Sequence, residues 1–245
     1  MVVLCLATSA AAQTSSTKLA TTYVAPTKGN DSDGCTKTKP CKTIAAALLN
    51  TREGGAVILT EAAEKPGACL VVYDNVIISK SVTIKPTRGL PSKPCFTPGS
   101  LDSSFIVDGA NIKVKLKSMK IDYGGGHVGI RFLNGATLEI DDFFMDSLNE
   151  GIIQARGHSM IVTKSVITAS RKIRIEDETE VGRTAELRST NLAGHTSDDH
   201  CAVEVGTNSQ LLMRGGGISG EARCALKVNG AVRLINVRVS KTQGQ

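Results

Sequence analysis

The sequence has 245 residues, a formal net charge of +6 and a hydrophobic content of 41%, which is enough for one large domain with a substantial core. Only 3% of the residues are aromatic and tryptophan is absent, which argues against a neutral-glycan cleft with aromatic platforms and against a nucleic-acid surface that stacks bases. The basic balance favours anionic partners such as acidic glycans or cell surfaces; the alternative is a mildly basic surface with no such role.

Residues 1–12 are expected to form a signal peptide. Apolar and small residues fill positions 2–12, which carry no charge and are too short to span a bilayer. Cleavage after Ala12 would leave the Ser/Thr-rich residues 13–22 as a flexible lead-in. The protein is therefore expected to be secreted, to the extracellular space or the periplasm, with no membrane span.

A capping segment is expected to follow. A short strand signal at 21–25 precedes a loop rich in Gly, Asn and Asp. Thr43 suits the N-cap of a short Ala-rich helix, whose apolar side comprises Ile44, Ala47 and Leu48. Gly54 and Gly55 then precede the first buried strand, which is expected at 56–59.

From residue 104 onward, one apolar pattern returns six times. The copies are Ile112/Val114/Met119, Leu138/Ile140/Met145, Met160/Val162/Ile167, Ala185/Leu187/Leu192, Leu211/Met213/Ile218 and Val232/Leu234/Val239. Their period of roughly 21–26 residues is typical of a solenoid, in which each repeat is one coil stacked on its neighbours. Residues two positions apart face the same way on a strand but opposite ways on a helix, so the repeats are interpreted as strands.

Further elements complete each coil. Val82 and Ile84 are interpreted as an earlier copy of the pattern, with Ile84 aligned to Val114. A second strand precedes each copy, and small turns join the two, at Asn134-Gly135, Arg156-Gly157, Gly206 and Asn229-Gly230. These turn residues tolerate positive φ.

The start of the chain resembles a known family. The residues that carry the resemblance are Tyr23-Val24-Ala25-Pro26, Gly29-Asn30-Asp31 and Pro40-Cys41-Lys42-Thr43-Ile44. They resemble the amino-terminal cap of secreted bacterial right-handed parallel β-helix proteins of the pectin-lyase-like superfamily, closely over 23–60 and elsewhere only by the repeat pattern. The resemblance implies that a short helix plugs the first coil. We therefore predict an all-β protein, a right-handed parallel β-helix of about 7 coils over 23–245, with 23–55 as its N-terminal cap.

Six cysteines follow the leader, an even number that suits disulfides in an oxidising compartment. Aligned coils place Cys201 and Cys224 in one column on neighbouring strands, about 4.8 Å apart, which is within reach of a disulfide. Cys35 and Cys41 flank a short turn and are expected to pair, which leaves Cys69 with Cys95. Zinc is the alternative, but the sequence has no CxxC pair.

Outward-facing basic residues are the candidate ligand-binding residues. Lys113, Lys115 and Lys117 share one face of a strand. Two columns are expected to run across the coils: Arg131, Ile153, Arg174, Glu204, Lys227 in one, and Lys115, Asp141, Thr163, Arg188, Arg214 in the other. An acidic polysaccharide could lie along Lys113, Lys115, Lys117, Arg131 and Arg174. The alternative is that these are solvated charges that keep exposed strands from pairing.

Asp198, Asp199 and His200 are weak catalytic candidates, with His195 nearby. Paired carboxylates and a histidine can perform acid–base chemistry on a glycosidic bond; the alternative is turn chemistry in a loop. Glycosidases of the superfamily carry adjacent aspartates too, but the Gly-His-Gly and Arg-x-Lys segments that follow them there are missing here. No cofactor or metal site is expected, except Ca²⁺ if the protein is lyase-like; no spacing then selects among Asp108, Asp122, Asp141 and Asp146.

The leading hypothesis is a secreted, non-catalytic β-helix that presents a lateral face to an acidic polysaccharide or a cell-envelope surface. One alternative is a polysaccharide lyase or glycoside hydrolase, and another is an adhesin-like or spike-like structural module. A nucleic-acid partner is not expected. No capping helix is visible after Val239, so the open C-terminal end is a candidate oligomer contact; the alternative is a frayed end shielded by polar residues.

Overall fold

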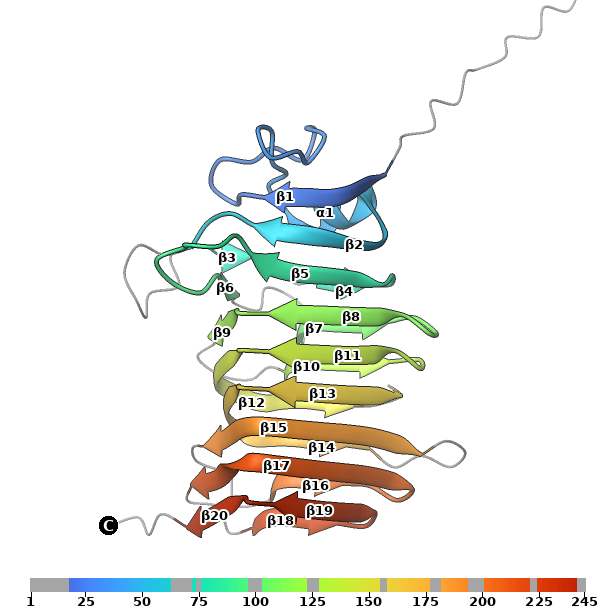
Figure 1. The fold of residues 1–245 in the computed structure, drawn as a ribbon, viewed down its shortest axis with the longest axis vertical. Coiled ribbons are helices and arrows are strands. Elements are labelled where there is room, and N and C mark those ends of the chain that lie inside the picture. Colours follow the sequence, from blue (N-terminus) through green and yellow to red (C-terminus); the bar gives the residue numbers. More distant parts are fainter. Residues whose placement is uncertain are drawn as a thin grey trace, which may run out of the picture.

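A computed structural model of the chain describes residues 18–62, 72–73, 76–96, 103–122, 128–154, 158–176, 182–193, 201–220 and 224–241. These residues wind into a parallel β-helix with a short helix at its N-terminal end (Figure 1). The chain runs in one direction along the near side and in the other along the far side as it descends (Figure 1). This is the right-handed winding that parallel crossovers adopt, and the predicted fold class is confirmed.

The strands form three ladders of parallel pairs. The front ladder contains β1 (Leu19–Val24), β2 (Thr51–Leu59), β5 (Val82–Pro86), β8 (Lys113–Lys117), β11 (Thr137–Asp141), β13 (Ser159–Thr163), β19 (Ala231–Ile235) and the first parts of β15 (Arg183–Ala193) and β17 (Ser209–Gly220). The back ladder contains β4 (Val76–Ile78), β7 (Ser103–Asp108), β10 (Val128–Leu133), β16 (Cys201–Val205), β18 (Cys224–Val228) and the second parts of β12 (Phe144–Gln154) and β14 (Val166–Ile175).

A side ladder joins these two. It contains β3 (Val72–Tyr73), β6 (Cys95–Phe96), β9 (Lys120–Asp122), β20 (Arg238–Lys241), the first parts of β12 and β14 and the second parts of β15 and β17. This ladder adds a third strand to the two that the sequence predicts for a coil.

Aliphatic columns fill the interior. On the front ladder Leu138, Met160 and Ala185 are paired in register from one turn to the next, and each is at most 3% exposed. Alternate residues of the same strands point outward, because successive side chains of a strand face opposite ways. A slip of one residue would turn all the apolar side chains of a strand outward. Burial of the core therefore determines which side of every strand faces inward.

The register of the first copy differs from the prediction. Val114 pairs with Leu138 and Leu116 with Ile140, so the alignment of Ile112 and Val114 to these positions was wrong by two residues. Ile84 likewise pairs with Leu116 rather than with Val114. Apolar residues occupy 112, 114 and 116, and a slip of two residues keeps them all inward. Hydrophobic alternation therefore could not distinguish the two registers.

Corner turns fix that register instead. After each front strand from β8 onward, one residue adopts a left-handed conformation, at Ser118, Asp142, Lys164, Ser189, Gly215 and Asn236, with φ between 49° and 65°. The amides of Ser118, Asp142 and Lys164 donate to carbonyls of the next turn at 2.9–3.0 Å. Each corner is thus bonded to the corner beneath it. The expected positive-φ turn at Asn134-Gly135 is confirmed, whereas a later coil uses Asn208 rather than Gly206.

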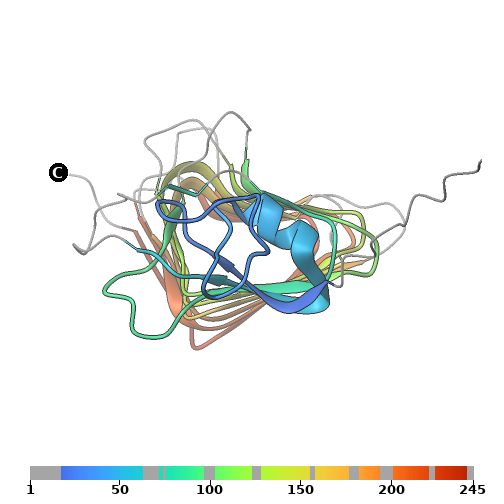
Figure 2. The same ribbon diagram turned by 90° about the horizontal axis from the view of Figure 1, so that it is seen from above.

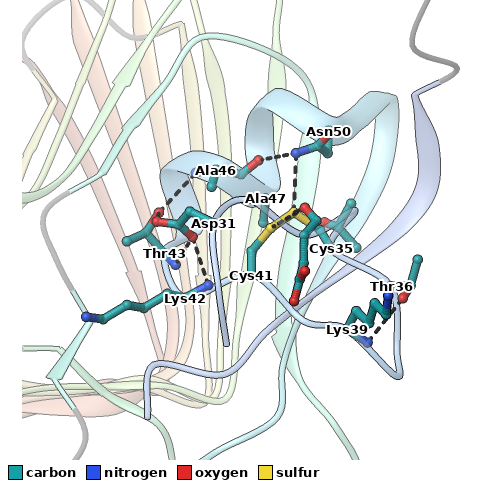
Figure 3. The surroundings of a disulfide bond; sticks show 12 residues. Asp31, Cys35, Thr36, Lys39, Cys41, Lys42, Thr43, Ala46, Ala47 and Asn50 are labelled. Carbon is teal, nitrogen blue, oxygen red and sulfur yellow. Dashed lines mark hydrogen bonds between the residues drawn. A yellow bond between two sulfur atoms is a disulfide. The ribbon is translucent and has the colours of Figure 1, made fainter. Parts of the chain in front are cut away.

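The N-terminal cap covers the first coil (Figure 2). Helix α1 (Ile44–Asn50) begins after Thr43, whose Oγ1 accepts from the Ala46 amide at 3.1 Å as expected for an N-cap. The Asp31 carboxylate accepts from the amides of Lys42 and Thr43 at 2.8 Å each (Figure 3). Strand β1 begins at Leu19 and β2 at Thr51, so residues 19–22 of the expected lead-in belong to a strand and β2 begins earlier than expected.

Two of the three predicted disulfides are confirmed, Cys35–Cys41 and Cys201–Cys224. Cys95 is also disulfide-bonded, and its expected partner, Cys69, lies outside the described residues, as do the predicted signal peptide and residues 13–17. Within the described ranges, no helix is long and apolar enough to cross a bilayer.

The C-terminal end of α1 is held by a lysine from the next coil, which generates a first prediction. Lys80 Nζ donates to the carbonyls of Leu48 at 2.7 Å and Thr51 at 2.9 Å. Since hydrogen bonds from a charged donor contribute about 1.5–3 kcal/mol each before desolvation, we expect Lys80→Met to lower the free energy of unfolding by about 1–3 kcal/mol in urea titrations. Lys85→Met, at an exposed position of β5, is the matched control; an equal loss there would contradict the role of Lys80.

Candidate functional site

One outward-facing column runs across the back ladder. Residues paired in register from turn to turn are Ile77, Ile106, Arg131, Ile153, Arg174, Glu204 and Lys227. We call this set the outward column. Their neighbours in the same strands point inward; Ile130 and Phe132, for example, are 0% exposed on either side of Arg131. The column predicted from the repeat is therefore present, extended by Ile77 and Ile106, and Ile153 within it is only 1% exposed.

Arg131 is the distinctive member of the outward column. Its register neighbours are Ile106 and Ile153, so no carboxylate lies above or below it. Its Nε is buried without a hydrogen-bond partner, as is that of Arg174. Unlike Arg174, Arg131 forms no ion pair with a carboxylate of the described residues. A partly buried guanidinium beside apolar side chains has lost water without gaining a counter-ion. Such a group favours an anionic ligand that can supply the missing acceptor.

A charged cluster follows on the next turns. Arg171 lies between two carboxylates, with NH1 2.6 Å from Glu150 and Nε 3.4 Å from Glu204. Arg174 reaches the other oxygen of Glu150 at 3.4 Å and Glu176 at 3.0 Å. The Arg171 side chain is only 9% exposed. We call these five residues the charged cluster; its cations, unlike Arg131, already have carboxylate partners.

A hollow of about 250 Å³ adjoins the charged cluster. Two carboxylates, Glu176 and Glu204, and two cations, Arg174 and Lys227, line it together with Ile175, Val205, Gly206 and Asn229. Lys227 is exposed. The hollow offers both hydrogen-bond donors and acceptors, which suits a hydroxyl-rich or carboxylate-bearing ligand better than an apolar one.

The three predicted lysines of β8 lie on the front ladder, so they do not form one patch with Arg131 and Arg174 of the back ladder (Figures 1 and 2). Lys115 pairs with Glu139 of β11 at 2.6 Å, and Lys117 lies 4.0 Å from Asp141. Only Lys113 stays exposed. Carboxylates of the next turn thus compensate most of this expected anion-binding face.

The second predicted column needs one correction. Lys117, rather than Lys115, is aligned with Asp141, Thr163, Arg188 and Arg214, because of the two-residue register difference. Glu186 lies beside the two arginines, 2.6 Å from Arg188 and 3.3 Å from Arg214. The hydrogen bond from Arg188, together with both positive charges, lowers the pKa of the Glu186 carboxyl. This front-ladder column is therefore also internally paired.

The predicted catalytic candidates Asp198, Asp199 and His200, with His195, lie outside the described residues. In the sequence they come directly before Cys201, at the start of β16. No three His, Cys, Asp or Glu side chains of the described ranges converge in a way that could hold a metal ion. The predictions for catalysis and for Ca²⁺ therefore stay predictions.

Sequence reasoning missed Glu150 and Arg171. Both lie in strands that turn the corner from the side ladder to the back ladder, where the β12–β14 register shifts between Met145 and Leu148. This shift breaks the alternation that assigns residues to faces. A usable signal was present, since the two opposite charges are 21 residues apart, close to one coil of the repeat.

Comparison with known proteins finds similar solved structures but no family. No family model and no curated protein matches the chain. Among solved structures, a rhamnogalacturonan lyase is similar with 12% identity and a TM-score of 0.49, over 90% of this chain and 66% of that one. A GH136 lacto-N-biosidase from Eubacterium ramulus is similar with 7% identity and a TM-score of 0.37, over 91% of this chain and 68% of that one. The chain thus spans about two thirds of the length of these proteins.

The charged cluster generates a prediction on stability. Arg171→Met would leave the partly buried Glu150 and Glu204 without their shared cation, and breaking a buried ion pair from one side costs about 3–5 kcal/mol. We expect a loss of that order in the free energy of unfolding, measured by urea titration at neutral pH. Arg188→Met removes an arginine that is 51% exposed, and should change the free energy of unfolding much less, because exposed ion pairs contribute little to stability. Similar losses for both variants would contradict the importance of burial.

Lys172, which follows Arg171 in β14, generates a prediction on pH dependence. It is 0% exposed, and burial lowers the pKa of its ammonium group from 10.5 to about 8. Below pH 8 both the folded and the unfolded chain hold this proton, so the cost of burying the charge is fully present. Between pH 8 and 10.5 the folded chain loses the proton first, and the cost disappears as pH rises.

We therefore expect the stability of Lys172→Met relative to the parent chain to fall by about 3 kcal/mol as pH rises from 8 to 10.5, because only the parent chain is relieved of a buried charge over this range. Urea titrations of both proteins at several pH values measure the difference, in which the titration of the other lysines cancels. A difference that does not change with pH would show that burial does not perturb Lys172.

Proposed function

We propose that this protein binds an acidic polysaccharide along the outward column of the back ladder, without cleaving it, and that Arg131 is the principal contact for the ligand's carboxylates. Turns spaced about 4.8 Å apart present Arg131, Arg174 and Lys227 in one line, so that an extended polymer could meet several of them. The disulfides favour a location of the protein outside the reducing cytosol, where acidic polysaccharides and cell-envelope surfaces occur.

The observation that carries this proposal is the lack of a counter-ion at Arg131. Lys115 and Lys117 of β8 and the arginines near Glu186 have their carboxylates within the fold, whereas Lys113 is an exposed lysine at the start of β8. Arg131 has none in the described residues, and its Nε is buried without an acceptor. A carboxylate ligand would satisfy the guanidinium through charge-assisted hydrogen bonds, the strong class of such bonds.

Cleavage of the same polymer is the second candidate function. The hollow beside the charged cluster places Glu176 and Glu204 near Lys227, and paired carboxyl groups are the usual means of glycoside hydrolysis. Asp198, Asp199 and His200 remain further candidates for this chemistry. Glu176 and Glu204 each pair with an arginine, so both carboxylates are already engaged within the fold. We therefore rank binding above cleavage.

The test is retention on immobilised polygalacturonate and alginate as a function of salt. We expect retention at low ionic strength that weakens as salt rises, and a loss of about tenfold or more in affinity for Arg131→Gln, since a hydrogen bond to a charged group contributes about 1.5–3 kcal/mol. Lys115→Gln, which removes a lysine already paired with Glu139, is the matched control and should bind like the parent chain.

Two results would reject the proposal: no retention on any acidic glycan, or equal losses for Arg131→Gln and Lys115→Gln. The same glycans are assayed, with and without Ca²⁺, for new chain ends produced by cleavage. Product formation that Glu204→Gln or the double variant Asp198→Asn, Asp199→Asn abolishes would establish cleavage in place of simple binding.

A further inference from the structure

The first and last described coils differ in how they are covered. At the N-terminal end, the outer edge of β1 is bonded to the cap loop: the Tyr23 amide donates to the Cys35 carbonyl at 2.9 Å, and the Ala25 amide to the Cys41 carbonyl at 2.8 Å. Helix α1 covers the apolar interior with Ile44, Ala47 and Leu48, which are at most 6% exposed. Both the main chain and the core are therefore closed at this end.

The last described coil, formed by β18, β19 and β20, has neither protection. Its strands pair on one side only, β18 with β16 and both β19 and β20 with β17. Each therefore presents a free edge in the described residues. A row of unpaired amides and carbonyls on such an edge is a template for another strand.

The core columns continue into this coil but are not covered. Val228, Leu234 and Val239 are paired in register with Val205, Met213 and Ile218 of the preceding coil. The preceding residues are at most 2% exposed, whereas Val228, Leu234 and Val239 are 42%, 39% and 52% exposed. The same inward-facing columns are thus buried on one turn and open on the next. This exposed apolar end differs from scattered surface residues because its members belong to one core.

The positive charge of the last described coil favours an acidic partner over a second copy of this chain. Residues 224–245 contain Lys227, Arg233, Arg238 and Lys241 and no Asp or Glu. Lys227, Arg233 and Arg238 are exposed, and no ion pair joins them to a carboxylate of the described chain. A second copy stacked on the same surface would bring like charges within about one or two strand spacings of each other. An acidic partner gains from the same charges.

We propose that the last coil docks a polypeptide segment that extends the β-helix by strand addition and alternates apolar residues with aspartate or glutamate. Its main chain would pair with the free edges of β18, β19 and β20. Its apolar side chains would cover Val228, Leu234 and Val239, and its carboxylates would meet Lys227, Arg233 and Arg238. This protein-binding surface lies at the last described coil; it shares Lys227 with the end of the outward column but does not include Arg131.

The probe is a short, end-blocked peptide of alternating valine and aspartate, compared with one of valine and lysine, in anisotropy titrations against the full chain. We expect the acidic peptide to bind and the basic one not to. Reversal of two charges by Arg233→Glu with Arg238→Glu should weaken acidic-peptide binding by about tenfold or more and make the basic peptide bind. These positions are exposed, so the variants should fold, as circular dichroism would verify.

Leu234→Lys tests the apolar contact and should weaken binding of the acidic peptide. Arg131→Gln should leave it unchanged, which separates this surface from the glycan site, so that either proposal can fail alone. Several outcomes would overturn the docking proposal: binding of neither peptide, binding that the charge reversal leaves intact, or binding that Arg131→Gln abolishes. Light scattering of the chain alone should show a monomer. A dimer that Leu234→Lys dissociates would identify a second copy as the occupant instead.

Discussion

Stacking of one turn on the next is the interaction on which this structure depends. Met213 is 0% exposed because Leu234 of the following turn lies on it in register, and Leu234 is 39% exposed because the described residues place no turn above it. No single turn can bury its own aliphatic residues, so each contributes stability only through its neighbours. The same dependence explains why the first turn is covered by a helix, a disulfide-bonded loop and the Lys80 contact to that helix.

The corners make the stacking unique. Aliphatic columns distinguish inward from outward residues but tolerate a slip of two, as the Val114 and Leu116 strand shows. The left-handed residues Ser118 and Asp142 remove this ambiguity, because each bonds the corner beneath it and cannot be displaced along the strand without losing that bond. Register then decides which side chains are neighbours across turns, and through them which charges are paired.

These two levels of control explain what the sequence could predict. Period, strand character, capping helix and the Cys201–Cys224 pairing all follow from local pattern plus the repeat, and the structure has them. The register of the first copy does not follow, since the corner residue Ser118 carries no sequence mark of its left-handed conformation. The charged cluster does not follow either, because Glu150 and Arg171 lie where an irregularity in β12 and β14 interrupts the alternation.

Arg131 and Lys115 show why a binding site on such a fold is not visible in one strand alone. Both are outward-facing basic residues in the middle of regular strands, and the sequence predicted the same role for both. They differ in the residue one turn further on, which is Ile153 beside Arg131 and Glu139 beside Lys115. A carboxylate at that position pairs with the cation within the fold, whereas an isoleucine leaves the cation to pair with an external anion. The unit that carries binding information in a β-helix is therefore the column, and its members lie a full turn apart in the chain.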